Sequence, residues 1–163
     1  MSFQPTPYLD CHICEIEILA TANISSNTTA INLGNILIDT GGQITVASNF
    51  ITFPANMEFF VKSNLVCQSV NGGTTITLAY TTFKDASNNP LQYQATGQGA
   101  ARTGANSGTS FQSTDCFMCL FSSASARSAK LTLDYATAGQ PTSIPYNSAT
   151  SYIPNSSILI LYK

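Results

Sequence analysis

The sequence predicts an all-β protein, a single-domain jelly-roll sandwich of about eight to ten antiparallel strands. Short apolar stretches with a period of two, rich in β-branched and aromatic residues, recur along the 163 residues. Clusters of Gly, Pro, Asn and Asp separate these stretches, as expected for turns. No segment combines the length of a helix with its 3.6-residue period. Many short strands at regular spacing are typical of a sandwich or a jelly roll.

The first half of the chain contains strands that differ in how they end. The expected strands are Cys14–Ala20, Ile36–Asp39, Gln43–Val46, Asn49–Phe53, Met57–Val70 and Thr74–Phe83. In the first strand, Glu15 and Glu17 alternate with apolar residues, which predicts one buried face. Pro54 ends the fourth strand, because proline cannot donate a ladder hydrogen bond. Asn71-Gly72-Gly73 predicts a hairpin turn between the last two strands, since these residues tolerate positive φ.

The second half of the chain alternates strands with longer connections. The expected strands are Leu91–Ala95, Ser110–Phe121, Ala129–Tyr135 and Ser157–Tyr162. Lys84–Pro90 and Ala138–Pro145 are expected to be loops by composition. Gly97–Gly108 is rich in Gly and Ala, so we expect a long, mobile connection. No linker divides the chain, and we assign residues 1–13 to an N-terminal arm and residues 14–163 to the jelly-roll domain.

The composition indicates a surface that is polar but carries little charge. Charged residues make up 9% of the chain, against about 25% in average soluble domains. Sixty Ser, Thr, Asn and Gln residues supply neutral hydrogen-bonding groups instead. A chain with a net charge of −2 and few charges of either sign associates easily, which suits a protein packed in an assembly. An ordinary exposed β-protein with a Thr-rich surface is the alternative interpretation.

The distribution of charge and apolar residues argues against two classes of partner. The six basic residues are spread over the whole chain, so no stripe of them follows a phosphate backbone and we expect no nucleic acid. No apolar run reaches the roughly 20 residues needed to cross a bilayer, so we expect no membrane. Met1–Asp10 lacks the basic and apolar regions of a signal peptide. We therefore expect synthesis in a host cytoplasm.

Four of the five cysteines form two C-x-x-C pairs, Cys11 with Cys14 and Cys116 with Cys119. Two such pairs have the spacing of a structural zinc site, and a disulfide is a second alternative. Buried thiols are the interpretation that we favour, because the two cysteines of a pair point to opposite faces of an extended strand. We therefore expect no metal and no cofactor.

The same alternation assigns individual cysteines to the core. Cys14 is expected to join the apolar residues of its own strand in the core. Cys119 is expected to lie in the core with Phe117 and Phe121.

The sequence contains no recognisable catalytic constellation. His12 is the only histidine, and no Gly-x-Ser-x-Gly elbow is present to expose a nucleophilic serine. Nothing marks any two of the eight acidic residues as a catalytic pair. We therefore expect a protein that is not an enzyme.

One stretch resembles a known family. Between Asp39 and Ser69, a Gly-containing turn precedes a strand, then the step Phe50–Ala55, then an aromatic strand that starts at Met57. This order is similar to the jelly roll of the tumour necrosis factor superfamily and of the complement globular heads. The last strand, Ser156–Tyr162, resembles the closing strand of that family, which lies in the trimer core.

The resemblance implies a compact homotrimer that binds proteins or glycans. Trimeric jelly rolls of this type also occur on viruses and bacteriophages, as decoration or cement proteins and as spike heads. Apolar strands such as Phe117–Phe121 and Ile158–Leu161 contain more hydrophobic residues than one face can bury, and a second buried face would stabilise a trimer. The candidate trimer-interface residues are Phe117, Phe121, Ile158, Ile160 and Tyr162.

These inferences predict a structural virion protein, a homotrimer that decorates or cements a capsid on the virion surface. Its partner would be the major capsid protein or another virion protein. Proline favours an extended arm at the N-terminus, which would reach that partner, and a merely frayed terminus is the alternative interpretation. The candidate capsid-contact residues are Phe3, Pro5, Pro7 and Tyr8.

The alternative function is a receptor- or carbohydrate-binding head of a spike or fibre. Exposed tyrosines would then stack on a glycan. The candidates are Tyr93, Tyr135, Tyr146 and Tyr152, although tyrosines that merely pack at strand ends would show the same pattern.

Overall fold

Strands alone make up the regular structure of the described residues in this computed structural model. It describes residues 11–19, 21–22, 28–71, 76–91, 94–96, 99–102, 108–122, 124–135, 143–144 and 156–163. The strands are β1 His12–Ile18, β2 Thr21–Ala22, β3 Leu33–Asp39, β4 Thr45–Ala47, β5 Phe50–Phe53, β6 Met57–Asn71, β7 Ile76–Lys84, β8 Gln94–Thr96, β9 Gly99–Arg102, β10 Gly108–Ser122, β11 Arg127–Tyr135, β12 Ser143–Ile144 and β13 Ser157–Tyr162. Nine of them have four or more residues, and the expected all-β jelly-roll sandwich is confirmed.

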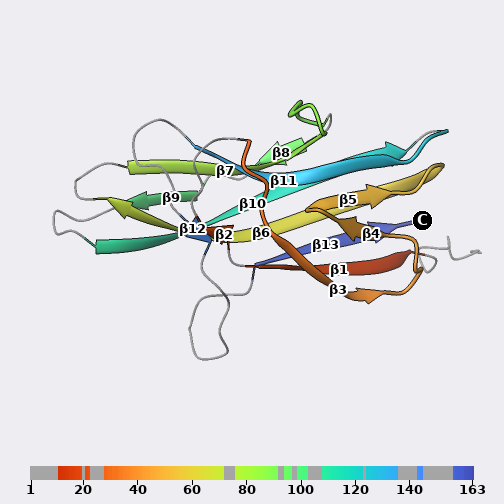
Figure 1. Ribbon diagram of the computed structural model, residues 1–163, viewed down its shortest axis with the longest axis horizontal. Helices are drawn as coiled ribbons and strands as arrows, with labels where there is room; N and C mark the ends of the chain where they lie inside the picture. The colour runs from red at the N-terminus through yellow and green to blue at the C-terminus, as the bar shows by residue number, and fades with distance from the viewer. Residues whose placement is uncertain are drawn as a thin grey trace, which may run out of the picture.

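The strands form two antiparallel sheets that run along the long axis of the molecule (Figure 1). In the large sheet β3, β1, β13, β6 and β10 follow one another, and β8 pairs with the far side of β10. Strand β12 pairs with β6 beyond the end of β13, and β2 pairs with β12. The small sheet has the order β4-β5-β11-β7-β9.

The two long antiparallel strands β6 and β10 form the centre of the large sheet. The two strands pair over their full length, from Gly108 opposite Asn71 to Ser122 opposite Met57. Where their side chains are described, at 57–65 of β6 and 116–122 of β10, apolar residues alternate and one side of each strand faces the core. Both strands extend only one or two residues beyond their expected bounds.

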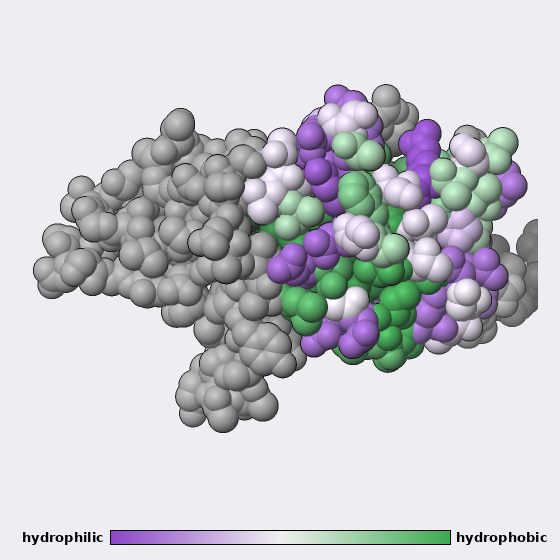
Figure 2. Space-filling model, in the orientation of Figure 1, coloured by the Kyte–Doolittle hydropathy of each residue, from purple (hydrophilic) through white to green (hydrophobic). Residues whose placement is uncertain are grey.

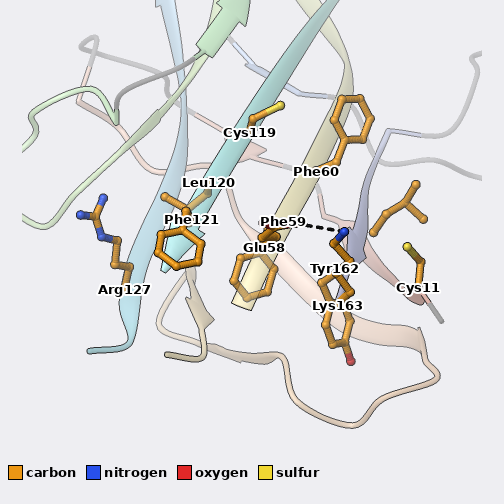
Figure 3. Close-up of a pocket in the computed structure, with 11 residues that line it drawn as sticks. Cys11, Glu58, Phe59, Phe60, Cys119, Leu120, Phe121, Arg127, Tyr162 and Lys163 are labelled. Atoms are coloured by element: carbon orange, nitrogen blue, oxygen red, sulfur yellow. Dashed lines mark ion pairs between the residues drawn. The ribbon is translucent and has the colours of Figure 1, made fainter. Parts of the chain in front are cut away.

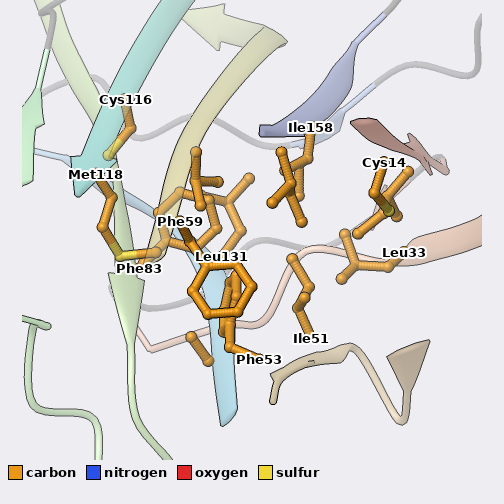
Figure 4. Close-up of a cluster of buried hydrophobic side chains, with 14 of the residues drawn as sticks. Cys14, Leu33, Ile51, Phe53, Phe59, Phe83, Cys116, Met118, Leu131 and Ile158 are labelled. Carbon is orange, nitrogen blue, oxygen red and sulfur yellow. The ribbon is translucent and has the colours of Figure 1, made fainter. Parts of the chain in front are cut away.

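The core lies between the facing sides of the two sheets (Figure 4). On the large sheet, Cys14, Ile160, Val61 and Met118 lie opposite one another on four neighbouring strands, and all four are buried. The rings of Phe53 on β5 and Phe59 on β6 meet edge to face, with centroids 5.1 Å apart. The other buried residues of the small sheet include Ile51, Phe83, Leu131 and Leu133.

A buried ion pair joins β7 to β11 in the small sheet. The ammonium of Lys84 lies 2.5 Å from a carboxylate oxygen of Asp134, and both side chains are less than a tenth exposed. Beside it, the hydroxyl of Thr132 donates a hydrogen bond to the carbonyl oxygen of Thr82 at 3.1 Å. These contacts satisfy polar groups that the sandwich removes from water, which would otherwise destabilise the fold.

Several expected boundaries were wrong: β3 begins three residues before the expected Ile36, and β8 begins three residues after the expected Leu91. Strand β1 begins at His12, so two residues assigned to the N-terminal arm belong to the sheet. The stretch Gly97–Gly108 contains β9, which pairs with β7 although small residues give it little strand propensity. The expected loop Ala138–Pro145 contains β12. Pairing with longer neighbours formed these short strands, and that pairing leaves no local pattern in the sequence.

Candidate functional site

The side of the large sheet that faces away from the core carries most of the exposed large apolar side chains of the described residues. We call this surface the outer face. It is formed by Ile38 of β3, Ile13, Glu15 and Glu17 of β1, Leu159 and Leu161 of β13, Glu58, Phe60 and Lys62 of β6, and Phe117, Cys119 and Phe121 of β10. Figure 2 shows apolar residues gathered over the part of the view that β1, β3 and β13 occupy in Figure 1.

One row of the outer face is apolar across four strands. The register places Ile13 opposite Leu161, Leu161 opposite Phe60, and Phe60 opposite Cys119. Phe60 is 41% exposed, although its ring lies 6.2 Å from the ring of Phe117 in the next row. A continuous apolar row of this kind is typical of a surface that another protein covers.

The next row carries two charges of the outer face, Glu15 and Lys62. Glu15 lies opposite Leu159, Leu159 opposite Lys62, and Lys62 opposite Phe117. The ammonium of Lys62 lies 5.6 Å from the centre of the Phe117 ring, a cation–π contact. Lys62 therefore extends toward β10 and away from Glu15, and neither forms an ion pair with a described side chain.

A groove of about 990 Å³ lies at the end of the outer face where β13 ends and β6 begins (Figure 3). It is lined by Cys11, Glu58, Phe59, Phe60, Cys119, Leu120, Phe121, Arg127, Leu161, Tyr162 and Lys163. Two of its lining residues, Glu58 and Lys163, form an exposed ion pair of 3.3 Å (Figure 3). The groove continues the apolar row, since Phe60 and Leu161 belong to both.

A hydrogen-bond cluster below the groove fixes the end of β13. Tyr162 donates a short hydrogen bond to Asp39, whose carboxylate also accepts from the backbone N–H of Gly41 at 3.2 Å and of Ile44 at 3.0 Å. Partial burial by itself raises the pKa of Asp39, but these hydrogen bonds to the charged form outweigh it and hold the pKa below its usual value. Burial, followed by the bond to Asp39, raises the pKa of Tyr162 to about 12.

Three of the candidate trimer-interface residues were assigned to the wrong side of the sheet. Ile158, Ile160 and Tyr162 are at most 1% exposed, because they face the core of their own chain. The residues between them, Leu159 and Leu161, face outward instead. Strand β13 is apolar in both phases of its alternation, so the choice of phase had no support from the sequence.

The two phenylalanine candidates on β10 do face outward. Phe117 and Phe121 are exposed, and the expectation that Cys119 lies with them in the core was wrong. Cys116, three residues earlier on the same strand and in the opposite phase of the alternation, lies in the core instead.

The cysteines follow the alternation expected for extended strands. Cys14 and Cys116 are buried, whereas Cys11 and Cys119 are exposed, and all four are free thiols. Burial raises the pKa of Cys14 and of Cys116 to about 12, so both thiols are protonated at neutral pH. The four cysteines of the suggested zinc site therefore do not meet, and within the described ranges no three metal-ligating side chains gather.

Several expected site residues lie outside the described residues. These are the arm candidates Phe3, Pro5, Pro7 and Tyr8, and the glycan candidates Tyr93, Tyr146 and Tyr152. The side chain of Tyr135, on β11, is also outside the description. His12 is described, and its ring packs 5.2 Å from that of Tyr162. In the part of the chain that is described, no helix has the length and apolar character needed to cross a membrane.

Comparison with solved structures relates this arrangement of sheets to known proteins. A crystal structure of murine APRIL at pH 8.0 superposes with a TM-score of 0.55 and 7% sequence identity, covering 93% of this chain and 98% of that one. Structures of the same mouse protein at pH 8.5 and pH 5.0 each superpose with a TM-score of 0.53 and 8% sequence identity, and they cover the same fractions of the two chains. The chain has a jelly roll of the tumour necrosis factor type. No model of a protein family matches the sequence, and no curated protein sequence is similar to it.

In this jelly roll the outer face belongs to the sheet that contains both the first and the last long strands. The resemblance noted from the sequence is therefore supported at the level of the fold. At 7–8% identity, no residue of murine APRIL is carried over to this chain.

Proposed function

We propose that the chain is a structural protein that assembles as a homotrimer through the outer face of its large sheet. The apolar row from Ile13 through Leu161 and Phe60 to Cys119 is the observation that carries this proposal. Its exposed side chains would be removed from water in an assembly, at a gain of about 25 cal/mol per Å² of apolar area. The low charge of the chain supports the same interpretation, because charged residues are depleted at the centre of interfaces.

The second part of the proposal concerns what the trimer attaches to. We propose that it decorates or cements a capsid on the virion surface, with the major capsid protein or another virion protein as its partner. Two features support this: the polar but weakly charged composition, and the resemblance to jelly rolls that viruses and bacteriophages carry as decoration proteins. Once the outer face is covered by other copies, the arm, the ends of the trimer and the outward side of the small sheet remain, and we propose the arm for this contact.

The attachment is tested by deleting Met1–Asp10. Capsids that lack the protein are mixed with purified protein and sedimented through a density gradient. We expect full-length protein to sediment with the particles and the deletion variant to remain at the top. The variant should keep its β-sheet circular dichroism spectrum and its oligomeric state, because β1 begins only at His12.

Two outcomes would contradict the attachment. If the deletion variant binds particles as well as the full-length chain does, the arm is not the contact. If full-length protein fails to bind particles at all, the capsid proposal is wrong, and glycan binding by the same trimer becomes the function to examine.

A further inference from the structure

The outer face carries charges of both signs that form no ion pair with a described side chain of the same chain, and these lie on different strands. Glu15 and Glu17 face outward from β1, whereas Lys62 faces outward from β6. Glu58 also faces outward from β6, but it pairs with Lys163. The register places Leu159 between Glu15 and Lys62, so two strand spacings, or about 10 Å, separate their backbones. Lys62 lies over Phe117, on the side away from Glu15.

Assembly through this face would take both charges out of water. Burying an unpaired carboxylate or ammonium destabilises an interface strongly, because the charge exchanges water for an apolar surrounding. Within one chain the carboxylate of Glu15 and the ammonium of Lys62 stay apart, because Lys62 extends toward the ring of Phe117. A second copy, which carries both charges, can bring an opposite charge to each of them without moving Lys62.

We propose that Glu15 of one copy pairs with Lys62 of the next and thereby sets how the copies pack. This inference rests on the proposed self-assembly and adds the residues that determine its geometry. The β1 half of the face then contacts the β6–β10 half of its neighbour, a head-to-tail contact between two different patches. A contact of that kind closes into a ring when the rotation between copies allows it, as in a trimer.

Charge exchange at the two positions tests the pairing. Glu15→Lys and Lys62→Glu are each expected to place like charges together and to raise the concentration at which the assembly dissociates by about tenfold or more. The double variant, Glu15→Lys with Lys62→Glu, restores opposite charges in every contact and is expected to return to within about threefold of the wild type. Sedimentation velocity over a dilution series measures all four proteins.

Lys130→Glu is the matched control. Lys130 lies over the ring of Phe50 at 5.9 Å, just as Lys62 lies over Phe117, but it belongs to the small sheet. The substitution changes the net charge by the same amount, and we expect no change in assembly. Circular dichroism of each variant shows whether its fold is retained.

The outcomes separate this inference from the proposed function. Wild-type assembly that is weakened by both single variants and restored by the double variant supports the pairing. If the wild type assembles and the single variants assemble equally well, the pairing is wrong. The pairing is also wrong if the double variant does not restore assembly. In both cases the proposed self-assembly is retained. A wild-type chain that stays monomeric overturns both.

Discussion

We expect Phe60→Asp to convert the proposed homotrimer into a folded monomer. Phe60 lies at the centre of the apolar row, between Leu161 and Cys119, and its ring extends from the surface. An aspartate there would bury a carboxylate against apolar side chains of another copy, which costs about 3 kcal/mol or more, or about a hundredfold in the association constant. Because the side chain faces outward, we expect the fold of the single chain to persist. Analytical ultracentrifugation measures the mass, and circular dichroism measures the fold.

Phe50→Asp is the control for this prediction. Phe50 faces outward from the small sheet, beneath Lys130, and takes no part in the outer face. We expect this variant to assemble as the wild type does. If Phe60→Asp assembles normally too, or if both variants dissociate, the outer face is not the interface.

Asp134→Ala destabilises the fold by about 3–5 kcal/mol, because it leaves the ammonium of Lys84 buried without its carboxylate. This loss is a large part of the 5–15 kcal/mol by which domains are usually stable. The combined replacement Lys84→Met with Asp134→Leu removes both charges and is expected to retain more stability than the single variant. Urea unfolding followed by circular dichroism, at one protein concentration for all variants, gives the free energies of unfolding.

Glu58→Ala serves as the comparison, because it removes an ion pair that is more than half exposed. Exposed pairs contribute little, so we expect a change of about 0.5 kcal/mol or less. An equally small change for Asp134→Ala would contradict the burial of the Lys84–Asp134 pair.

The sequence predicted the strands that carry a clear pattern of their own. Strand β13 was expected at its observed bounds, and β6 and β10 to within two residues, because each is a long run of strand-forming residues. Short strands such as β9 were missed, since pairing with β7 forms them and their own composition does not.

The outer face was predicted only in part, and the reason is the phase of the alternation. In β1 the glutamates mark the outward side, so Cys14 was correctly assigned to the core. In β10 the phase of Phe117 and Cys119 also contains Asp115, a charge that favours the outward side and that the assignment of Cys119 to the core passed over. In β13 both phases are apolar, and no charge marks either side. The register between β1 and β13 resolves this, since Glu15 lies opposite Leu159, but a register between strands nearly 150 residues apart cannot be read from one sequence.

The mass of the wild-type protein in solution tests the central proposal most directly. Light scattering after size exclusion, at micromolar concentration, should give about three times the 17.3 kDa of one chain. Assembly through the outer face predicts this value, with Phe60→Asp eluting at the mass of a single chain in the same experiment. A wild-type mass of one chain across the whole concentration range would contradict the proposal.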